Sequence, residues 1–434
     1  MKPVRLAIAA VYLAALPSPS GAQEQVLTLA EAIRLAGEHS PTVVQAQGGV
    51  RSSGAAVRAA WGGFLPDIRG SASYGTSFSE GPSRTDPITG QVISGNSSST
   101  SLGFGADASF DLFTGFRRGA DLSSTRASRR AAVAGLDYET AQTALLATNR
   151  FLQALQNAAL VRVRQDATRR AEEKRAIAIA RLSTRAATIA DSLQAEVDLG
   201  QARVQLVNEE ARLAEAEANL ARATGFTGRV AAVEDSSLYV TVTIPEAAVL
   251  LEEASARAPG VLRAEAQADA ARANVGVARS SYWPTLTVGA NTRMSGTSFN
   301  DYDLFSSRGV SLGLQWTLFN RFGRERDLAQ RTATRDEAEA RAADARREVA
   351  ANLTTQIAAA RAAEQRIALT TANVEAARAN ARVQTERYRL GSIGIVELNA
   401  SQDALSRAEE EAVSARFDYL RAKAQIEAIL GRPL

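Results

Sequence analysis

Two hydrophobic periods alternate along this chain of 434 residues. In the segments 67–78 and 101–112, apolar and polar residues alternate, a pattern that predicts β-strands. The much longer segments 117–182 and 188–223 repeat their apolar residues at helical spacing and contain no proline. The chain is therefore expected to combine short paired strands with unusually long helices.

This order of elements occurs twice. The segment beginning Phe113-Thr-Gly-Phe116 reappears as Phe319-Asn-Arg-Phe322, with an offset of 206 residues (319 − 113 = 206). The same offset pairs Gly225 with Gly431. A repeat of this length indicates a duplicated supersecondary unit, larger than a solenoid repeat.

The duplication predicts the domain organisation. The first structural repeat covers 23–225, a linker or equatorial segment covers 226–244, and the second repeat covers 245–434. In the second repeat, strands are expected at about 285–295 and 309–319, a long helix at 323–390 and a return helix at 395–430. Each long helix would reach about 100 Å at 1.5 Å per residue.

The return helices carry a seam of apolar residues spaced seven apart. Its members are Leu398, Leu405, Ala412, Tyr419 and Ile426 and, 206 positions earlier, Ser192, Leu199, Leu206, Leu213 and Leu220. A period of 3.5 residues is typical of supercoiled helices. A coiled-coil rod protein is the alternative interpretation of this segment alone.

The four strands have the length and pattern of transmembrane β-strands. Each runs for about 11 residues, enough for a tilted strand to cross the hydrocarbon layer. One face is apolar, whereas the other holds Arg69, Asp107, Asp111 and Arg293 and should be wet. Four strands cannot close a barrel, and open edges in lipid are costly, so several copies must contribute. A soluble hairpin with one buried face is the alternative.

The N-terminal residues 1–22 have the pattern of a secretory signal. Lys2 and Arg5 precede the apolar run Leu6–Leu16, and Ser20-Gly21-Ala22 offers small residues for cleavage. Eleven apolar residues are too few for a membrane-spanning helix. We therefore predict export, with a weak membrane anchor as the alternative.

Composition excludes several classes of function. The formal charge is +3 and basic and acidic residues nearly balance, so no nucleic acid or other polyanionic partner is implied. The chain has no cysteine, hence no disulfide, thiolate metal site or lipidated N-terminal cysteine. With one histidine, His39 at a helix boundary, and no phosphate loop, we predict no enzyme, no metal and no cofactor.

The tandem order of helix, strand hairpin, long helix, turn and return helix resembles the TolC-like outer-membrane efflux family (outer membrane factors). Arg387-Tyr388-x-x-Gly391 and the seam ending in Leu430-Gly431 resemble it too. The resemblance implies a membrane α+β fold: a homotrimer whose 12-stranded outer-membrane β-barrel, four strands per chain, is continuous with a long coiled-coil α-helical barrel in the periplasm.

The resemblance also implies a function and partners. The trimer would be the exit duct of a tripartite efflux or type I secretion system, anchored in outer-membrane lipid and closed at the periplasmic helix turns. It would dock there with a periplasmic membrane-fusion adaptor and a proton-driven or ATP-driven inner-membrane pump. A periplasmic coiled-coil scaffold or adaptor is the alternative, and an ordinary porin would lack the long helices.

The gate is expected just after the turns, at the equivalent residues Asp191 and Glu397. Rings of carboxylates at a constriction select cations. The resemblance implies that Tyr388 bonds to the Asp191 side of a neighbouring helix and that Glu397 matches a pore-ring acid. Further family gate positions hold Ile393 and Ala400, so the lock is looser or uses Arg181, Arg185 or Arg387 instead. Simple helix capping is the alternative for both acids.

Two further sets complete the expected sites. The adaptor-docking turns are assigned to Ser183, Thr184, Arg185, Leu390, Gly391, Ser392 and Gly394. The membrane-interface aromatics are assigned to Phe113, Phe116, Tyr282, Trp283, Phe319 and Phe322. Aromatic rings concentrate at membrane interfaces, although these rings could instead cap a core where strand meets helix.

Overall fold

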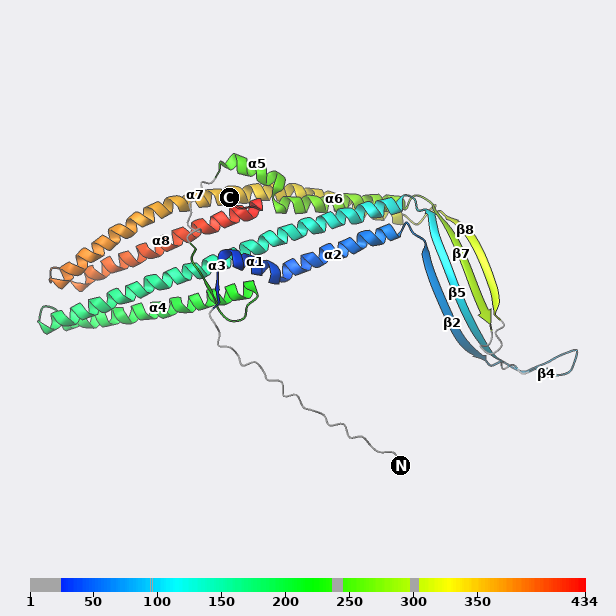
Figure 1. Ribbon diagram of the computed structural model, residues 1–434, viewed down its shortest axis with the longest axis horizontal. Helices are drawn as coiled ribbons and strands as arrows, with labels where there is room; N and C mark the ends of the chain where they lie inside the picture. The colour runs from blue at the N-terminus through cyan, green and yellow to red at the C-terminus, as the bar shows by residue number, and fades with distance from the viewer. Residues whose placement is uncertain (1–24, 94, 96, 236–244, 297–303) are drawn as a thin grey trace, which may run out of the picture. The chain divides into compact units, whose positions relative to one another are not determined.

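The computed structural model describes residues 25–93, 95, 97–235, 245–296 and 304–434 (Figure 1). The predicted signal sequence and residues 236–244 of the predicted linker lie outside these residues. The chain divides into two compact units. The helical unit comprises residues up to 44, 139–254 and 351–434, and the strand unit comprises 45–138 and 255–350. Each unit draws on both sequence repeats, so the repeats are not the compact units.

A four-stranded antiparallel sheet dominates the strand unit (Figure 1). Its order is β2-β5-β7-β8, with bounds β2 Asp67–Ser79, β5 Ser97–Phe113, β7 Thr285–Gly296 and β8 Phe305–Gln315. Between β2 and β5 the short strands β3 (Arg84–Thr85) and β4 (Val92–Ile93) pair with each other.

The register sorts side chains by polarity. Ala108 pairs with Ile68 and Ala290, and Ala290 pairs with Val310. This row and the residues alternating with it form the apolar face of the sheet, because side chains alternate between faces along a strand. The polar face lies on the other side and includes Asp107, which pairs with Asn291.

The predicted bounds of the fourth strand, 309–319, are wrong. β8 ends at Gln315 because its partner β7 begins at Thr285, directly after Pro284. Beyond Gln315 the backbone carbonyls bond to a side chain instead of a neighbouring strand. The guanidinium of Arg324 donates to the carbonyls of Thr317 (2.8 Å) and Leu318 (2.9 Å). The other end extends to Phe305, and β5 likewise begins at Ser97, earlier than the predicted 101.

Helices flank the sheet in sequence. They are α2 (Pro41–Gly62), α3 (Arg117–Ser183), α6 (Pro259–Ser280) and α7 (Gly323–Arg389). Pro41 and Pro259 occupy the first helical position, where the missing N–H costs no hydrogen bond. No helix within the described residues has both the length and the apolar character needed to cross a membrane.

The helical unit packs the distal parts of α3 and α7 with further helices. These are α1 (Leu29–His39), α4 (Ile189–Thr224), α5 (Ala247–Arg257) and α8 (Ile395–Leu430). Strands β1 (Gln25–Leu27) and β6 (Val230–Ala232) pair in parallel, and β6 lies in the predicted linker. The core gathers residues from α3, α4 and α8, chiefly Phe151, Leu152, Leu220, Phe417 and Leu420.

The heptad seam of the return helices lies inside this unit. Leu199 and Leu220 of α4 are buried, as are Leu405 and Ile426 of α8. Both helices end at a left-handed glycine, Gly225 (φ 84°) and Gly431 (φ 72°). A glycine in this conformation is the usual helix C-terminal cap.

Gly225 also makes room for the only histidine. A Cβ added at Gly225 would stand 2.6 Å from Cγ of His39. The Nδ1 of His39 lies 2.9 Å from the carbonyl oxygen of Leu35. His39 therefore packs the end of α1 against the end of α4, which is a structural role.

We predict that Gly225→Ala lowers the free energy of unfolding by about 2–4 kcal/mol, because the left-handed backbone and the clash with His39 both oppose a Cβ. The matched control is Gly228→Ala, where φ is 99° but nothing lies within 4 Å; it should cost only about 1–2 kcal/mol. Urea unfolding followed by circular dichroism measures both. Equal losses would contradict the role given to His39.

Candidate functional site

The two helix turns of the helical unit, α3 to α4 and α7 to α8, are built alike. In each turn one residue is left-handed, Arg185 (φ 59°) and its counterpart Gly391 (φ 82°). The N–H of Ala186 donates to the carbonyl of Arg181, and the N–H of Ser392 donates to that of Arg387, both at 2.8 Å. These are the bonds of a Schellman cap. The first turn thus places arginine where glycine is favoured.

The helices that follow start differently. Thr188 caps α4, and the carboxylate of Asp191 accepts from the backbone N–H of Thr188 at 3.0 Å, which completes a capping box. Gly394 begins α8 without a side-chain cap. The exposed Glu397 bends back over it, since a Cβ on Gly394 would lie 2.9 Å from Oε2.

Tyr388 is the buried centre of this end of the unit. Its side chain is 1% exposed and packs with Ala178, Ala195 and Leu398. The guanidinium of Arg181 lies 4.5 Å from the centre of its ring. Arg181 also donates from Nη2 to the carbonyl of Ala186 at 2.9 Å. One arginine therefore joins the α3–α4 turn to the last turn of α7.

The hydrogen bond between Tyr388 and Asp191 implied by the resemblance is not formed within this chain. The buried hydroxyl of Tyr388 has no hydrogen-bond partner among the described residues, and the carboxylate of Asp191 is engaged by Thr188. Burial raises the pKa of Tyr388, the nearby guanidinium of Arg181 opposes that rise, and the charge of Asp191 adds to it.

The remaining predicted turn residues lie at the surface. The hydroxyls of Ser183 and Thr184 donate to carbonyls of the preceding turn, whereas Leu390 is 80% exposed. The exposed Arg387 donates from Nη1 to the side-chain oxygen of Gln384 at 3.4 Å. Beside the turns lies a groove of about 550 Å³, lined by Glu173, Ala176, Ile177, Ala180, Arg181, Thr184 and Arg389.

A polar seam that we did not predict joins α3 to α8. The ammonium of Lys174, with only 5% of its side chain exposed, donates to Asp198 (2.6 Å) and to Asn399 (2.7 Å). Arg170 pairs with Glu409 at 3.0 Å and Arg164 with Glu410 at 2.8 Å. A cavity of about 360 Å³ opens among these side chains. The one sequence signal is the polar Asn399, which follows the seam residue Leu398.

Burial alone would raise the pKa of Asp198, but hydrogen bonds from Lys174, Gln194 and Asn399 and the charge of Lys174 leave it below its ordinary value. Burial raises the pKa of Glu410, with Arg164 opposing and the neighbouring glutamates reinforcing the rise. The described residues hold no group of three or more acidic or histidine side chains able to bind a metal ion.

In the strand unit the predicted interface aromatics lie where strands meet helices. Phe113 and Phe116 meet edge to face at 5.3 Å, and their counterparts Phe319 and Phe322 do so at 5.5 Å. Trp283 contacts Phe116 edge to face at 5.5 Å. The ring of Tyr282 lies under Arg324 at 4.9 Å.

Both strand-to-helix turns use left-handed backbone at non-glycine residues. Phe116 (φ 67°) and Phe322 (φ 62°) adopt it at equivalent positions, and so does Arg321 (φ 56°). Phe116 is 66% exposed and Phe322 is 70% exposed. Large exposed rings held in a strained backbone are typical of a functional surface.

Comparison with known proteins identifies the class. The outer membrane efflux protein family profile matches residues 32–226 and 250–432. Solved structures share the fold, among them VceC from Vibrio cholerae (17% identity, 93% of this chain and 96% of that one, TM-score 0.77) and CmeC from Campylobacter jejuni (14%, 93% and 85%, TM-score 0.79). No curated protein sequence matches the chain.

The chain therefore belongs to the outer membrane efflux protein family. The predicted fold class is confirmed at the level of the fold: four strands for an outer-membrane barrel together with a long helical domain. The protein is an outer-membrane channel of an efflux system that extends into the periplasm, and its family consists of channels rather than enzymes.

We predict that Asp198→Asn destabilises the protein by about 3–5 kcal/mol at neutral pH, because Lys174 keeps a buried charge without a carboxylate. Because the folded pKa of Asp198 is lowered, its contribution is present above the unfolded pKa of about 3.9 and is lost as pH falls through the folded value. The deficit should therefore shrink on acidification below about pH 4.

The control for Asp198→Asn is Asp166→Asn, which removes an exposed ion pair with Arg169. It should cost less than about 1 kcal/mol. The double variant Lys174→Met, Asp198→Leu should recover most of the loss, since it leaves no unpaired charge. Urea unfolding at several pH values measures all of these. A deficit that does not vary with pH would contradict the assignment.

Proposed function

We propose that three copies of this chain form the exit duct of a tripartite efflux or type I secretion system, conducting substrate passively and closing at the two helix turns. The observation that carries the proposal is the open four-stranded sheet. Within the described residues β2 and β8 each have one paired side only, and the apolar face is exposed, with Val310 at 82% and Phe78 at 80%.

An open sheet of this kind cannot stand alone in lipid. Each unpaired backbone group there costs several kcal/mol, so the free edge of β8 must pair with the free edge of β2 of another copy. Three copies of four strands give a twelve-stranded barrel, within the size range of outer-membrane barrels. The polar face, which includes Asp107 and Asn291, then lines a wet lumen.

The helical unit supports the same arrangement. Apolar residues of α4 at coiled-coil spacing form an exposed stripe, defined as Ile189, Leu193, Val197, Val204 and Val207, each 53–68% exposed. Their counterparts in α8, 206 residues later, include the polar Asn399 and Glu410, which contact α3 within the chain. After the duplication, this face thus became polar and packed against α3 in α8, whereas in α4 it became apolar and exposed.

By the pseudo-symmetry of the repeats, the exposed stripe should contact α7 of a neighbouring copy, as α8 contacts α3 within one copy. The surface of α7 offers Leu369 (66% exposed) and Val383 (56% exposed). Contacts of this head-to-tail kind build a closed ring when the rotation closes.

We predict that Val204→Glu dissociates the detergent-extracted trimer, because a carboxylate cannot be buried in an apolar helix seam without a partner. The conservative control Val204→Leu should remain trimeric. Light scattering coupled to size-exclusion chromatography measures the mass directly. A Val204→Glu protein that stays trimeric, or a wild type that is monomeric, would exclude this interface.

In the proposed gate, Arg181 provides the lock, because the further gate position of the family pattern is occupied by Ile393 in this chain. Arg181 lies over the ring of Tyr388 and donates to the next turn, so it holds the α3–α4 turn against α7. In a trimer Asp191 and Glu397 would each be repeated three times near the axis and would favour cations. The exposed turn residues and the groove beside them are the surface we propose for the periplasmic adaptor, which links the duct to an inner-membrane pump.

We predict that Arg181→Ala and Tyr388→Leu raise the open population of the channel about 5-fold, because a cation–π contact contributes about 1 kcal/mol. Tyr388→Phe keeps the ring and should remain closed. Arg387→Ala is the matched control, since Arg387 is the repeat counterpart of Arg181 but is exposed. Conductance in planar bilayers measures all four variants. Equal opening by Arg387→Ala would rule out the Arg181 lock.

The runner-up function is a periplasmic coiled-coil scaffold or adaptor. It would account for the helices but not for the four strands with an exposed apolar face. Membrane fractionation separates the two, because a scaffold would be released with the periplasmic fluid, whereas the proposed duct would sediment with the outer membrane.

A further inference from the structure

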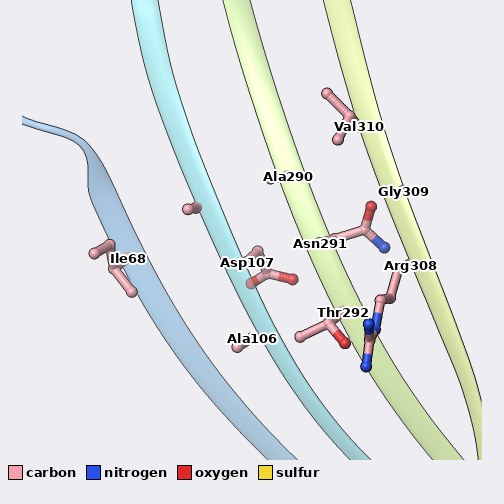
Figure 2. Close-up of a pocket in the computed structure, with 10 residues that line it drawn as sticks. Ile68, Ala106, Asp107, Ala290, Asn291, Thr292, Arg308, Gly309 and Val310 are labelled. Atoms are coloured by element: carbon pink, nitrogen blue, oxygen red, sulfur yellow. The ribbon is translucent and has the colours of Figure 1, made fainter.

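A hollow of about 460 Å³ lies on the four-stranded sheet (Figure 2). All four strands contribute to its lining, through Ile68, Ala106, Ala108, Ala290, Arg308 and Val310. Asp107 and Asn291 also border it, but they pair with each other in the alternate row, which belongs to the polar face. Ala108 pairs with Ile68 and Ala290, and Ala290 with Val310, so these four form one row across the apolar face. The next row contains Ala106, Thr292 and Arg308.

The hollow exists because small side chains are surrounded by large ones. Its floor is alanine on β5 and β7, while Ile68 and Val310 rise at its two sides. Along the strands the adjacent rows carry Phe104 with Met294 at one end and Phe110 at the other. The resulting depression is apolar, elongated and open to whatever surrounds the barrel.

Arg308 is the one charged side chain on the apolar face of the four strands within their described residues. The polar face, in contrast, carries Asp67, Arg69, Asp107, Asp111 and Arg293. The apolar face therefore provides no carboxylate for Arg308. A neighbouring copy would bring the same apolar face of β2, which has none either. Among the described residues of the four strands, therefore, no carboxylate on the apolar face serves as the counter-ion of Arg308.

The position of Arg308 along β8 indicates which membrane layer it meets. It lies seven residues from Gln315, the strand end nearest the helices (315 − 308 = 7). At about 3.3 Å per residue and a tilt of about 40°, this is about 18 Å of an apolar band about 25 Å tall. Because the helices are periplasmic, Arg308 stands in the outer leaflet.

We propose that this hollow binds one acyl chain of an anionic, phosphate-bearing membrane lipid, with the lipid phosphate paired to Arg308. Guanidinium and phosphate form paired charge-assisted hydrogen bonds, and the alanine floor accepts the chain. The site rests on the proposed function, since it requires the apolar face to meet lipid. Bound lipid would neutralise the single charge on this face and fill its one depression.

The test uses the full-length protein in nanodiscs of phosphatidylcholine containing a minority of phosphatidylglycerol. Native mass spectrometry of the released assembly counts the lipids retained. The wild type should retain phosphatidylglycerol about 5-fold over its share of the bilayer, the effect of one basic residue near an anionic lipid. Arg308→Gln should abolish that enrichment, and Arg293→Gln, which changes the polar face, should not.

A second pair of variants tests the hollow itself. Ala106→Phe fills it while keeping Arg308 and should reduce retention of both lipids, whereas Ala72→Phe makes the same change on the apolar face outside the hollow and should not. Inorganic phosphate added to the buffer should displace no lipid; displacement would mean that an anion alone binds, and would overturn the proposal.

The outcomes separate this proposal from the proposed function. Conducting trimers in which the wild type and Arg308→Gln retain equal phosphatidylglycerol would overturn the lipid site alone. Equal losses in Arg293→Gln would do the same. Failure of the wild type to enter nanodiscs as a conducting trimer would overturn the duct, and the lipid site with it.

Discussion

Backbone hydrogen bonding at the edges of β2 and β8 is the constraint on which the rest of this protein depends. Water can satisfy a free strand edge, but hydrocarbon cannot. A chain that inserts only four strands into a membrane must therefore pair its strand edges with other copies of itself. Its helices must then pack against the helices of those copies. In the helical unit, the exposed apolar stripe on α4 is the surface proposed for contact between copies, whereas its polar counterpart on α8 contacts α3 within the chain.

The duplication explains why two halves of equal design carry different chemistry. Both turns keep the same backbone hydrogen bonds, and both strand-to-helix junctions keep a left-handed phenylalanine. What diverged is the surface of each copy. α4 presents Leu193 and Val204 where α8 presents Asn399 and Glu410. Polar contacts and ion pairs hold the α8 seam, whereas burial would hold the proposed α4 seam. The polar seam is the more specific of the two, because each charge needs its own partner.

Much of the fold follows from period and repetition alone. Alternation located β2 and β5, the seam located the buried positions of α4 and α8, and the offset of 206 related them. The end of β8 did not follow, because Arg324 captures Thr317 and Leu318 through contacts that no hydrophobic pattern records. Lys174 was missed because its partners lie 24 and 225 positions away in the chain. The site residues came largely from resemblance, and the cation–π contact between Arg181 and Tyr388 was not foreseen from the sequence.

The left-handed residues of the two turns have a consequence for how such proteins change. Arg185 and Gly391 sit in one backbone shape with identical hydrogen bonds, although only glycine adopts that shape without strain. At these two helix turns, the surface charge can therefore change without a change in the backbone conformation. A lineage can exchange one side chain there for another and alter which partner it recognises, while the hairpin beneath keeps its form.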